Sequence, residues 1–392
     1  MSSISISPEK GTIELRVDRN ALLEGLQSAA RIASAKTSIT ALSGVQLAAS
    51  ATGIELRATD LELSLRLPLK GEVVSVGEVV LPARLFTDVV RALPNGQVSL
   101  KARSTKQDVE IKSGSATFDL KTLRAEDFPT LPEAVGDSEV TLPAEVLDST
   151  IKRVERAASS DPSRPVLTGV LVQAEGTSLK MVATDSYRLS VKETELSTPL
   201  TNAFEANVPA RALQEAVRLA KGVKGEVGAD ESGPASGSVR IVMQENQIVF
   251  DLDGTILASR LIDGQFPKYA ELIPDSFDHE VKLSASELLD VVRRISLLAQ
   301  RTKPLTLSFE KGSLTISAET PDIGEARESL PVPYDGEQLD IGFNPDYLRD
   351  GIESAGDEEI IFKLLSPNRP GLIESGSGGG FLYLIMPIRL GN

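Results

Sequence analysis

One amino-acid pattern recurs along this chain, and the recurrence limits the fold to a few copies of one module. The segments that begin at Ser43 and Thr168 each lead to an Ala-Thr-Asp, and their aspartates, Asp60 and Asp185, lie 125 positions apart. The tetrapeptide ending at Arg84 returns at Arg211, and more weakly before Asp346. Such a period exceeds that of solenoid repeats and matches a small domain. A chain of 392 residues therefore accommodates three copies.

Each copy predicts two helices packed on antiparallel strands. Apolar residues four apart mark one face of the first helix in every copy, and alternating apolar and polar residues mark half-buried strands. A second, short helix begins in each copy near a proline, which suits a first turn. The six helices are predicted over residues 18–36, 82–93, 143–159, 209–224, 284–303 and 345–355. The predicted class is α+β, with three repeated modules.

Segments rich in proline and acidic residues separate the copies, at residues 128–137 and 267–278. They predict three modules, over residues 1–135, 136–276 and 277–392. The glycine-rich stretch from Ser375 to Gly380 predicts a hairpin tip. It is no phosphate loop, because no Gly-Lys-Ser/Thr follows it and the next element is a strand.

The composition excludes several kinds of chemistry. The chain has no Cys and one His, His279, so disulfides, thiolate zinc sites, cysteine nucleophiles and most histidine triads are ruled out. We expect no cofactor, no metal and no catalytic residue. The first ten residues are polar, and no later run reaches the length of a membrane span. These features predict a cytoplasmic protein.

The charge distribution suggests nucleic acid as a partner, although the net charge of −15 argues against it. The six predicted helices hold 17 Lys and Arg against 12 Asp and Glu, which leaves −20 on the rest of the chain. Arg84 and Arg91 are seven residues apart and share a helix face, as do Arg211 and Arg218. The third copy departs, since Glu353 stands where the other two have Arg. A repeated basic face predicts contact with phosphates that does not read sequence.

The residues that carry the strongest resemblance to a known family are Ala183 to Leu189, Phe266 to Tyr269 and the terminal run Leu384 to Leu390. Together with the three repeats, they resemble the bacterial replicative sliding clamp, the beta subunit of DNA polymerase III. The resemblance covers nearly the whole chain. It implies two chains joined head to tail in a ring of six modules, with helices lining a hole around duplex DNA. The implied function is to tether DNA polymerase III, through its alpha subunit, together with the clamp loader and repair polymerases or ligase.

The resemblance also implies a groove between modules 2 and 3 that takes a short peptide with Leu and Phe anchors. Its lining is apolar with a few polar ends, as peptide grooves require. Ser186-Tyr187 and Glu271 depart from common family residues, so peptide preference should differ in detail. The matching positions are Leu167, Thr184, Ser186, Tyr187, Arg188, Leu189, Pro267, Leu272, Asn344, Tyr347, Leu384, Ile385, Met386, Pro387, Ile388, Arg389 and Leu390.

Two further sets of residues follow from the helix faces and from the resemblance. The DNA-facing residues are predicted to be Lys36, Arg84, Arg91, Lys152, Arg153, Arg164, Arg211, Arg218, Arg293 and Arg294. The positions that match the family's subunit interface are Phe118, Leu297 and Leu298. A core role for those three remains open.

Two alternatives compete with a clamp. The recurring Asp60 and Asp185 could serve a carboxylate-dependent enzyme, although recurrence at strand ends also suits a turn-forming aspartate. An acidic repeat protein of structural or adhesive role is the second alternative, but it would not explain basic helices.

Overall fold

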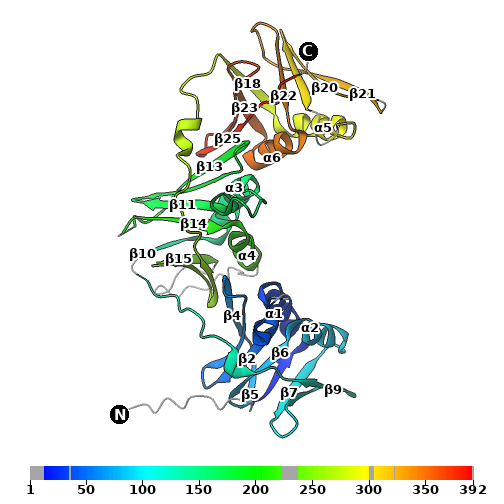
Figure 1. The fold of residues 1–392 in the computed structure, drawn as a ribbon, viewed down its shortest axis with the longest axis vertical. Helices are drawn as coiled ribbons and strands as arrows, with labels where there is room; N and C mark the ends of the chain where they lie inside the picture. The colour runs from blue at the N-terminus through cyan, green and yellow to red at the C-terminus, as the bar shows by residue number, and fades with distance from the viewer. Residues whose placement is uncertain are drawn as a thin grey trace. The chain divides into compact units, whose positions relative to one another are not determined.

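The structure of this chain is a computed structural model, and it describes residues 13–34, 37–136, 138–200, 202–221, 237–299, 304–321 and 323–390. These residues form α-helices and antiparallel strands, so the predicted α+β class is confirmed. They group into two compact units, Met1–Ala144 with Arg218–Arg260, and Glu145–Val217 with Leu261–Asn392. We call these unit 1 and unit 2 and describe each by itself (Figure 1).

The described residues contain six α-helices, two for each copy of the repeat. The first helix of each copy begins after a strand, where a polar side chain often caps it: Asp18 accepts hydrogen bonds from the amides of Asn20 and Ala21. The second helix of the third copy is capped in the same way by Asn344. The helices are α1 (Arg19–Ile32), α2 (Ala83–Ala92), α3 (Ala144–Val154), α4 (Ala210–Ala220), α5 (Ala285–Ser296) and α6 (Pro345–Ala355).

The predicted helices are too long, and this corrects the predicted charge contrast. Five of the six begin one residue later and end earlier than predicted. Within the observed bounds they hold 11 Lys and Arg against 10 Asp and Glu, a net charge of +1 rather than +5. The last turns of five helices carry basic residues, where the helix dipole favours cations. The predicted charge contrast between the helices and the rest of the chain is therefore weaker than expected, +1 against −16.

Every module divides into two four-stranded half-sheets, which we call A and B. Half-sheet A begins with the first strand of the module and then takes three strands from its end. In order, the A half-sheets are β1 (Glu14–Asp18), β7 (Gln97–Arg103), β8 (Asp108–Ser113) and β9 (Ala116–Lys121); β10 (Ser138–Pro143), β15 (Ser238–Gln244), β16 (Gln247–Leu252) and β17 (Thr255–Arg260); β18 (His279–Ser284), β23 (Glu359–Leu364), β24 (Gly371–Ser375) and β25 (Phe381–Ile385).

Half-sheet B holds the strands between the two helices of a module. Module 1 adds one extra strand, β5 (Gly71–Ser75), beside β1. In order, the B half-sheets are β6 (Gly77–Pro82), β2 (Gly44–Ser50), β3 (Gly53–Thr59) and β4 (Leu63–Leu69); β14 (Phe204–Pro209), β11 (Gly169–Glu175), β12 (Ser178–Thr184) and β13 (Arg188–Glu195); β22 (Leu339–Phe343), β19 (Leu305–Glu310), β20 (Ser313–Thr320) and β21 (Gly324–Pro331).

Consecutive modules share sheets. The last strand of half-sheet A in module 2, β17, pairs with β4 of module 1, and β25 of module 3 pairs with β13 of module 2. Each pairing joins two half-sheets into one eight-stranded sheet. The compact units therefore follow the shared sheets and divide module 2 between them. The three module boundaries given above stay a prediction.

The core lies between the helices and the sheets. In unit 1, α1 packs on β3 and β4 and contacts α2, and its buried residues include Leu22 and Leu26. In unit 2, α5 and α6 contact each other, and α6 packs on β24 and β25. Leu147 and Leu288, predicted in register with Leu22, are also fully buried. The apolar helix face predicted from the repeat is confirmed.

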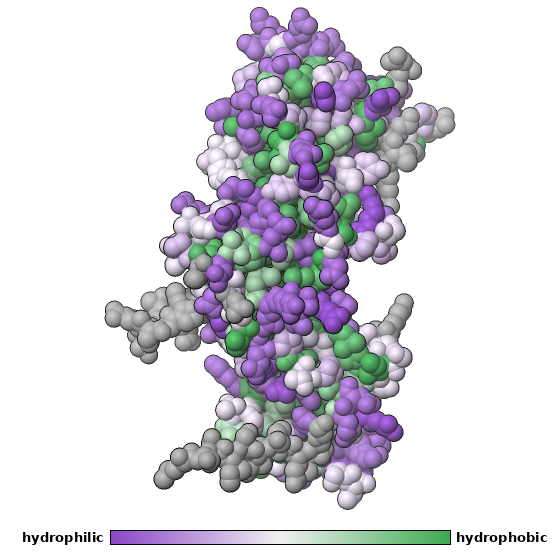
Figure 2. Space-filling model, turned by 60° about the vertical axis from the view of Figure 1, so that its left-hand side comes forward, coloured by the Kyte–Doolittle hydropathy of each residue, from purple (hydrophilic) through white to green (hydrophobic). Residues whose placement is uncertain are grey.

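The surface mixes polar and apolar residues. Figure 2 shows mostly hydrophilic side chains on the face in view, with hydrophobic ones in scattered patches. Among the described residues, none of the helices combines the length and the apolar character that a bilayer crossing requires.

Candidate functional site

The hairpin between β12 and β13 is built around Asp185. Its Oδ1 accepts hydrogen bonds from the amides of Tyr187 (2.9 Å) and Arg188 (3.0 Å), and Ser186 takes a positive φ of 81°. In the equivalent turn of module 1, Asp60 Oδ1 accepts hydrogen bonds from the amides of Glu62 (3.0 Å) and Leu63 (2.8 Å). The recurring aspartates therefore shape turns. In unit 2, this turn leaves the Tyr187 side chain 59% exposed.

The chain after β25 runs beside this hairpin. The amide of Met386 donates to the carbonyl of Tyr187 (2.9 Å), and the amide of Ile388 donates to the carbonyl of Gly342 (2.8 Å). Gly342 lies in β22, two residues before Asn344 and the start of α6. These two bonds join the terminal run to the hairpin and to β22, so these predicted groove residues lie together within unit 2.

The remaining predicted groove residues lie around one apolar cluster on the sheet of unit 2. Leu189 and Leu384 face each other across β13 and β25 and are buried with Phe266. Val166, beside Leu167, and Ile273, beside Leu272, pack against the same cluster, and Pro267 follows Phe266. The buried members are Thr184, Leu189, Leu384 and Ile385; the half-buried ones are Leu167, Arg188, Asn344, Tyr347, Pro387, Ile388 and Leu390; the exposed ones are Ser186, Tyr187, Pro267, Leu272, Met386 and Arg389.

Arg188 is the most strongly held polar residue of this group. Its Nε donates to Asp185 Oδ2 (3.0 Å) and its Nη1 to Asp350 Oδ2 (2.6 Å). Its guanidinium lies 4.3 Å from the centre of the Tyr347 ring. Burial lowers the pKa of Arg188, but Tyr383, Asp350 and Asp185 outweigh it, so the pKa lies above its ordinary value. The group stays charged.

The acidic side of α6 binds arginines from two other elements. Glu353 accepts a hydrogen bond from Arg156, in the 3₁₀ turn Glu155–Ala157, and one of 2.8 Å from Arg293 of α5. Asp350 lies 3.7 Å from Arg156 as well. Glu353, which sets the third copy apart, therefore neutralises two arginines of the same unit, including one predicted to face DNA.

Most of the predicted DNA-facing residues already have partners in the structure. Lys36 lies outside the described residues. Arg84 is exposed. Carboxylates neighbour five others, pairing Arg91 with Asp88, Lys152 with Asp148, Arg164 with Asp161, Arg293 with Glu353 and Arg294 with Glu328. Arg153 lies over the Phe381 ring, at 5.7 Å, and Arg211 and Arg218 also make polar interactions. Their role in binding DNA stays a prediction.

The predicted interface residues differ in exposure. Phe118 lies on β9, at the end of the five-stranded sheet of unit 1, and is 39% exposed. Leu297 follows α5 in unit 2 and is 84% exposed, while Leu298 beside it is half-buried. An apolar side chain as exposed as Leu297 suits a contact that the single chain does not make.

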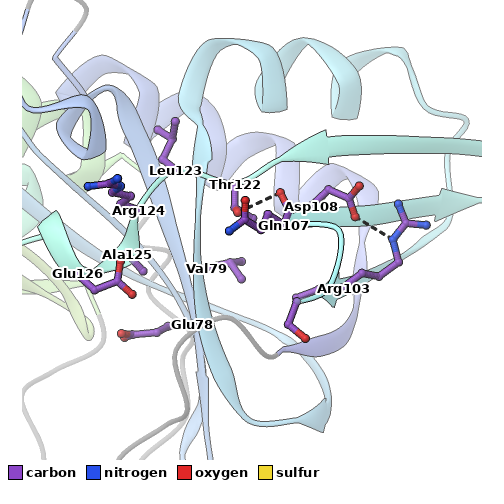
Figure 3. A pocket seen from close by; sticks show the side chains of 12 residues that line it. Glu78, Val79, Arg103, Gln107, Asp108, Thr122, Leu123, Arg124, Ala125 and Glu126 are labelled. Atoms are coloured by element: carbon purple, nitrogen blue, oxygen red, sulfur yellow. Dashed lines mark hydrogen bonds and ion pairs between the residues drawn. The ribbon is translucent and has the colours of Figure 1, made fainter.

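Unit 1 also contains a polar cavity, which Figure 3 shows from close by. It lies between β6, the β7–β8 turn and the segment after β9, and Arg103 and Asp108 pair on its wall at 2.8 Å. The hydrogen bond from Arg103 lowers the pKa of Asp108, so this carboxylate is ionised rather than poised as a general acid. The cavity does not support the enzyme alternative.

Sequence reasoning missed the residues that link α6 to module 2. Asp350 and Arg156 were absent from the predicted site, yet they bind Arg188 and Glu353. For the contact of Arg156 the signal was present in the sequence, because Glu353 stands where the other two copies have Arg; for Asp350 there was none, because this position is acidic in all three copies. An acidic helix in a repeat with excess arginine indicates an ion-paired contact between modules.

Three α+β modules that share their sheets in this way define the DNA-clamp fold. The N-terminal, central and C-terminal domains of the DNA polymerase III beta subunit match residues 13–132, 141–268 and 270–389. The beta sliding clamp of Streptomyces coelicolor is 32% identical over 96% of this chain and 100% of the relative. The crystal structure of the Bacillus subtilis clamp has a TM-score of 0.88 at 28% identity, over 97% of this chain and 100% of that one.

A further crystal structure, of the Pseudomonas aeruginosa clamp bound to griselimycin, has a TM-score of 0.86 at 30% identity and covers 97% of this chain and 100% of that one. The chain belongs to the DNA polymerase III beta subunit family. Its relatives are sliding clamps, which are processivity factors rather than catalysts. The enzyme alternative is therefore set aside.

Proposed function

We propose that two copies of this chain close into a ring around duplex DNA and tether the replicative polymerase and repair proteins through the groove of unit 2. The observation that carries the proposal is a rule of strand pairing. At both junctions within the chain, the strand at the outer end of an A half-sheet, β17 or β25, pairs with the strand at the outer end of a B half-sheet, β4 or β13. In the part of the chain that the structure describes, the equivalent strands are β9 in the A half-sheet of module 1 and β21 in the B half-sheet of module 3. Each lies at the edge of its sheet, where no further described strand pairs with it.

The same rule gives the register of the missing pair. Leu257 faces Leu65 at one junction, and Tyr383 faces Ser190, its repeat equivalent, at the other. Aligning the hairpins puts Phe118 at the position of Leu257 and Tyr383, and Ala326 at the position of Leu65 and Ser190. The four junction residues are buried, whereas Phe118 is exposed in the single chain. Pairing β9 with β21 of a second copy would bury Phe118 against Ala326.

Contacts between the helices of neighbouring modules support the same pairing of two copies. Arg156 reaches Asp350 and Glu353 on α6 of the next module. Leu297 occupies the position of Arg156 in the ungapped alignment of residues 142–157 with 283–298. It would therefore meet α2 of the second copy, where Asp88 and Arg91 occupy the positions of Asp350 and Glu353. Because Asp88 already pairs with Arg91 at 2.6 Å, an apolar residue fits there in place of the arginine. Two copies that pair head to tail by this rule would make two identical contacts. Neither a β9 edge nor a β21 edge would then be left unpaired, so the assembly would close into a ring.

The contact with DNA would be weak and nonspecific. Five of the ten basic residues predicted to face DNA already pair with carboxylates, which weakens their attraction for phosphates. Attraction between exposed charges falls off over about 8 Å at physiological salt. Such a ring can slide, and ring closure rather than affinity would keep it on DNA. A cytoplasmic location belongs to the same proposal.

The groove would receive short peptides with Leu and Phe anchors. Tyr187, Leu272 and Met386 expose apolar surface around the buried cluster. Met386 is flexible and suits varied partners. The expected partners are the alpha subunit of DNA polymerase III, the clamp loader and repair polymerases or ligase. Deleting residues 386–390 should abolish binding of such a peptide and leave the dimer intact; unchanged binding would refute the groove.

A crosslink tests the ring directly, because the chain has no cysteine of its own. The predicted register places Thr117 opposite Arg327 of the second copy, and opposite residues in antiparallel strands lie close enough for a disulfide. Oxidation of the T117C/R327C variant should give a covalent dimer. The T117C/A326C variant is the control, because its cysteines would point to opposite faces of the sheet. A monomer in both cases would contradict the proposal.

A further inference from the structure

One guanidinium connects two modules beside the proposed groove. Arg188 lies on the hairpin of module 2, and two of its neighbours, Asp350 and Tyr347, lie on α6 of module 3. Its side chain is only 10% exposed. The hydroxyl of Tyr383 accepts a bond of 3.4 Å from Arg188 and donates one of 2.9 Å to the carbonyl of Tyr347. Side chain and backbone of Tyr347 are thus both held by this network.

The repeat shows that the architecture does not require an arginine here. The equivalent position in module 1 is Leu63, which is buried at the junction with β17. In module 3, it is Gly324. The acidic residue on the second helix recurs as Asp88, Glu215 and Asp350. Arg188 is therefore what distinguishes the junction that carries the groove.

The hydrogen bond to Asp350 orients the guanidinium of Arg188. Asp185 lies on the same hairpin as Arg188, so its bond to Arg188 does not itself cross between modules, although Asp185 also hydrogen-bonds the Tyr347 side chain, and burial together with this carboxylate raises the pKa of Tyr347. The bond of 2.6 Å to Asp350 runs between modules and keeps the guanidinium over the Tyr347 ring. A charge-assisted bond between largely buried groups has a defined geometry and is stronger than a neutral one. Without Asp350, Arg188 still keeps one carboxylate partner, Asp185.

We propose that Asp350 is a positioning residue of the peptide groove. By holding Arg188 against Tyr347, it fixes the spacing between the 185–188 hairpin and the start of α6, the two walls between which an apolar peptide anchor would lie. The inference rests on the proposed function of the groove. A groove held in its bound shape binds more tightly because less order is lost on binding.

The test compares two isosteric variants on the same helix. D350N breaks the contact between modules, whereas D346N changes an exposed carboxylate that pairs with Arg349 of α6 itself. Binding of a labelled Leu/Phe-anchored peptide is measured by fluorescence polarisation. We expect roughly tenfold weaker binding for D350N and about unchanged binding for D346N. The D350E variant should restore part of the affinity. Equal affinities for D350N and the wild type overturn the inference.

A second measurement separates positioning from direct contact. In protein labelled at its five tyrosines, the Tyr347 ring signal should shift in D350N while that of Tyr334 stays in place; a Tyr347→Phe variant assigns the signal. Weaker binding with an unmoved Tyr347 signal would overturn the positioning role. If the wild type binds no such peptide, the proposed function fails, and the Tyr347 signal still tests the link to Asp350.

A third variant covers a failure of D350N to fold. Arg188→Leu places the residue of module 1 at this junction, so we expect a folded dimer with the same loss of peptide binding. A folded R188L protein with unchanged affinity also overturns the inference.

Discussion

Aspartates that recur in a repeat can look catalytic, and here their hydrogen bonds show a different use. Asp60 and Asp185 each accept two amide bonds in the turn that follows their strand. Asp185 additionally binds Arg188 at 3.0 Å, while Asp60 is followed by Leu63 in place of that arginine. One residue type therefore shapes a turn in both modules and binds an arginine of the proposed groove in only one.

This difference gives a matched pair of variants. Asp60→Ala and Asp185→Ala should each destabilise the protein by about 1–3 kcal/mol, because turn amides lose their acceptor. Only Asp185→Ala should also weaken peptide binding. Thermal unfolding and peptide titration check both results, and equal peptide affinities for the two variants would count against the groove.

Glu353 predicts a dependence of stability on pH. Burial raises its pKa, but hydrogen bonds from Arg156 and Arg293 outweigh burial, so the pKa lies below its ordinary value of 4.5. The unfolded chain then takes up this proton first as the pH falls. The stabilisation is complete above about pH 4.5 and is lost as the pH drops through the folded pKa.

The E353Q variant lacks this titration. Its melting temperature should be lower than that of the wild type at neutral pH, and the gap should narrow in acid below pH 4.5. Melting curves across this range measure the gap. A gap that widens in acid would show that Glu353 is not held ionised by its two arginines.

At the scale of elements, the sequence predicted what is local and missed what joins distant segments. The apolar register of Leu22, Leu147 and Leu288 follows from helical spacing and was confirmed. Five helices end earlier than the sequence pattern predicts, because polar and basic residues typical of a helix continue beyond the last helical turn. The contact between Arg156 and Glu353 joins residues 197 positions apart, and no spacing rule reports such a pair. The groove and interface residues came from the resemblance to relatives, since the repeat pattern alone does not separate them from the core.

The free edges predict the effect of a charge on β9. Phe118→Glu should convert the dimer to monomers, because burying a Phe contributes about 1.5–3 kcal/mol and the ring has two such contacts. Sedimentation measures the change. Val135→Glu is the control, since that side chain is 72% exposed and lies outside both predicted contacts. A stable F118E dimer would place the interface elsewhere.

For the whole molecule, the proposed ring depends on a rule of strand pairing rather than on a particular residue. Two junctions within the chain obey it, and a second copy would satisfy it at the two edges that remain. The near-neutral helices fit this view better than the predicted charge contrast, because a topological link to DNA does not need strong electrostatic attraction.

Oxidation of the T117C/R327C dimer after it has been loaded onto circular DNA tests whether the ring encloses the duplex. Both contacts would then be covalent, and a closed ring should stay on the circle in denaturing detergent. Cutting the DNA once should release it. Release from the intact circle in detergent, or retention on the linear DNA, would contradict a ring that encloses the duplex.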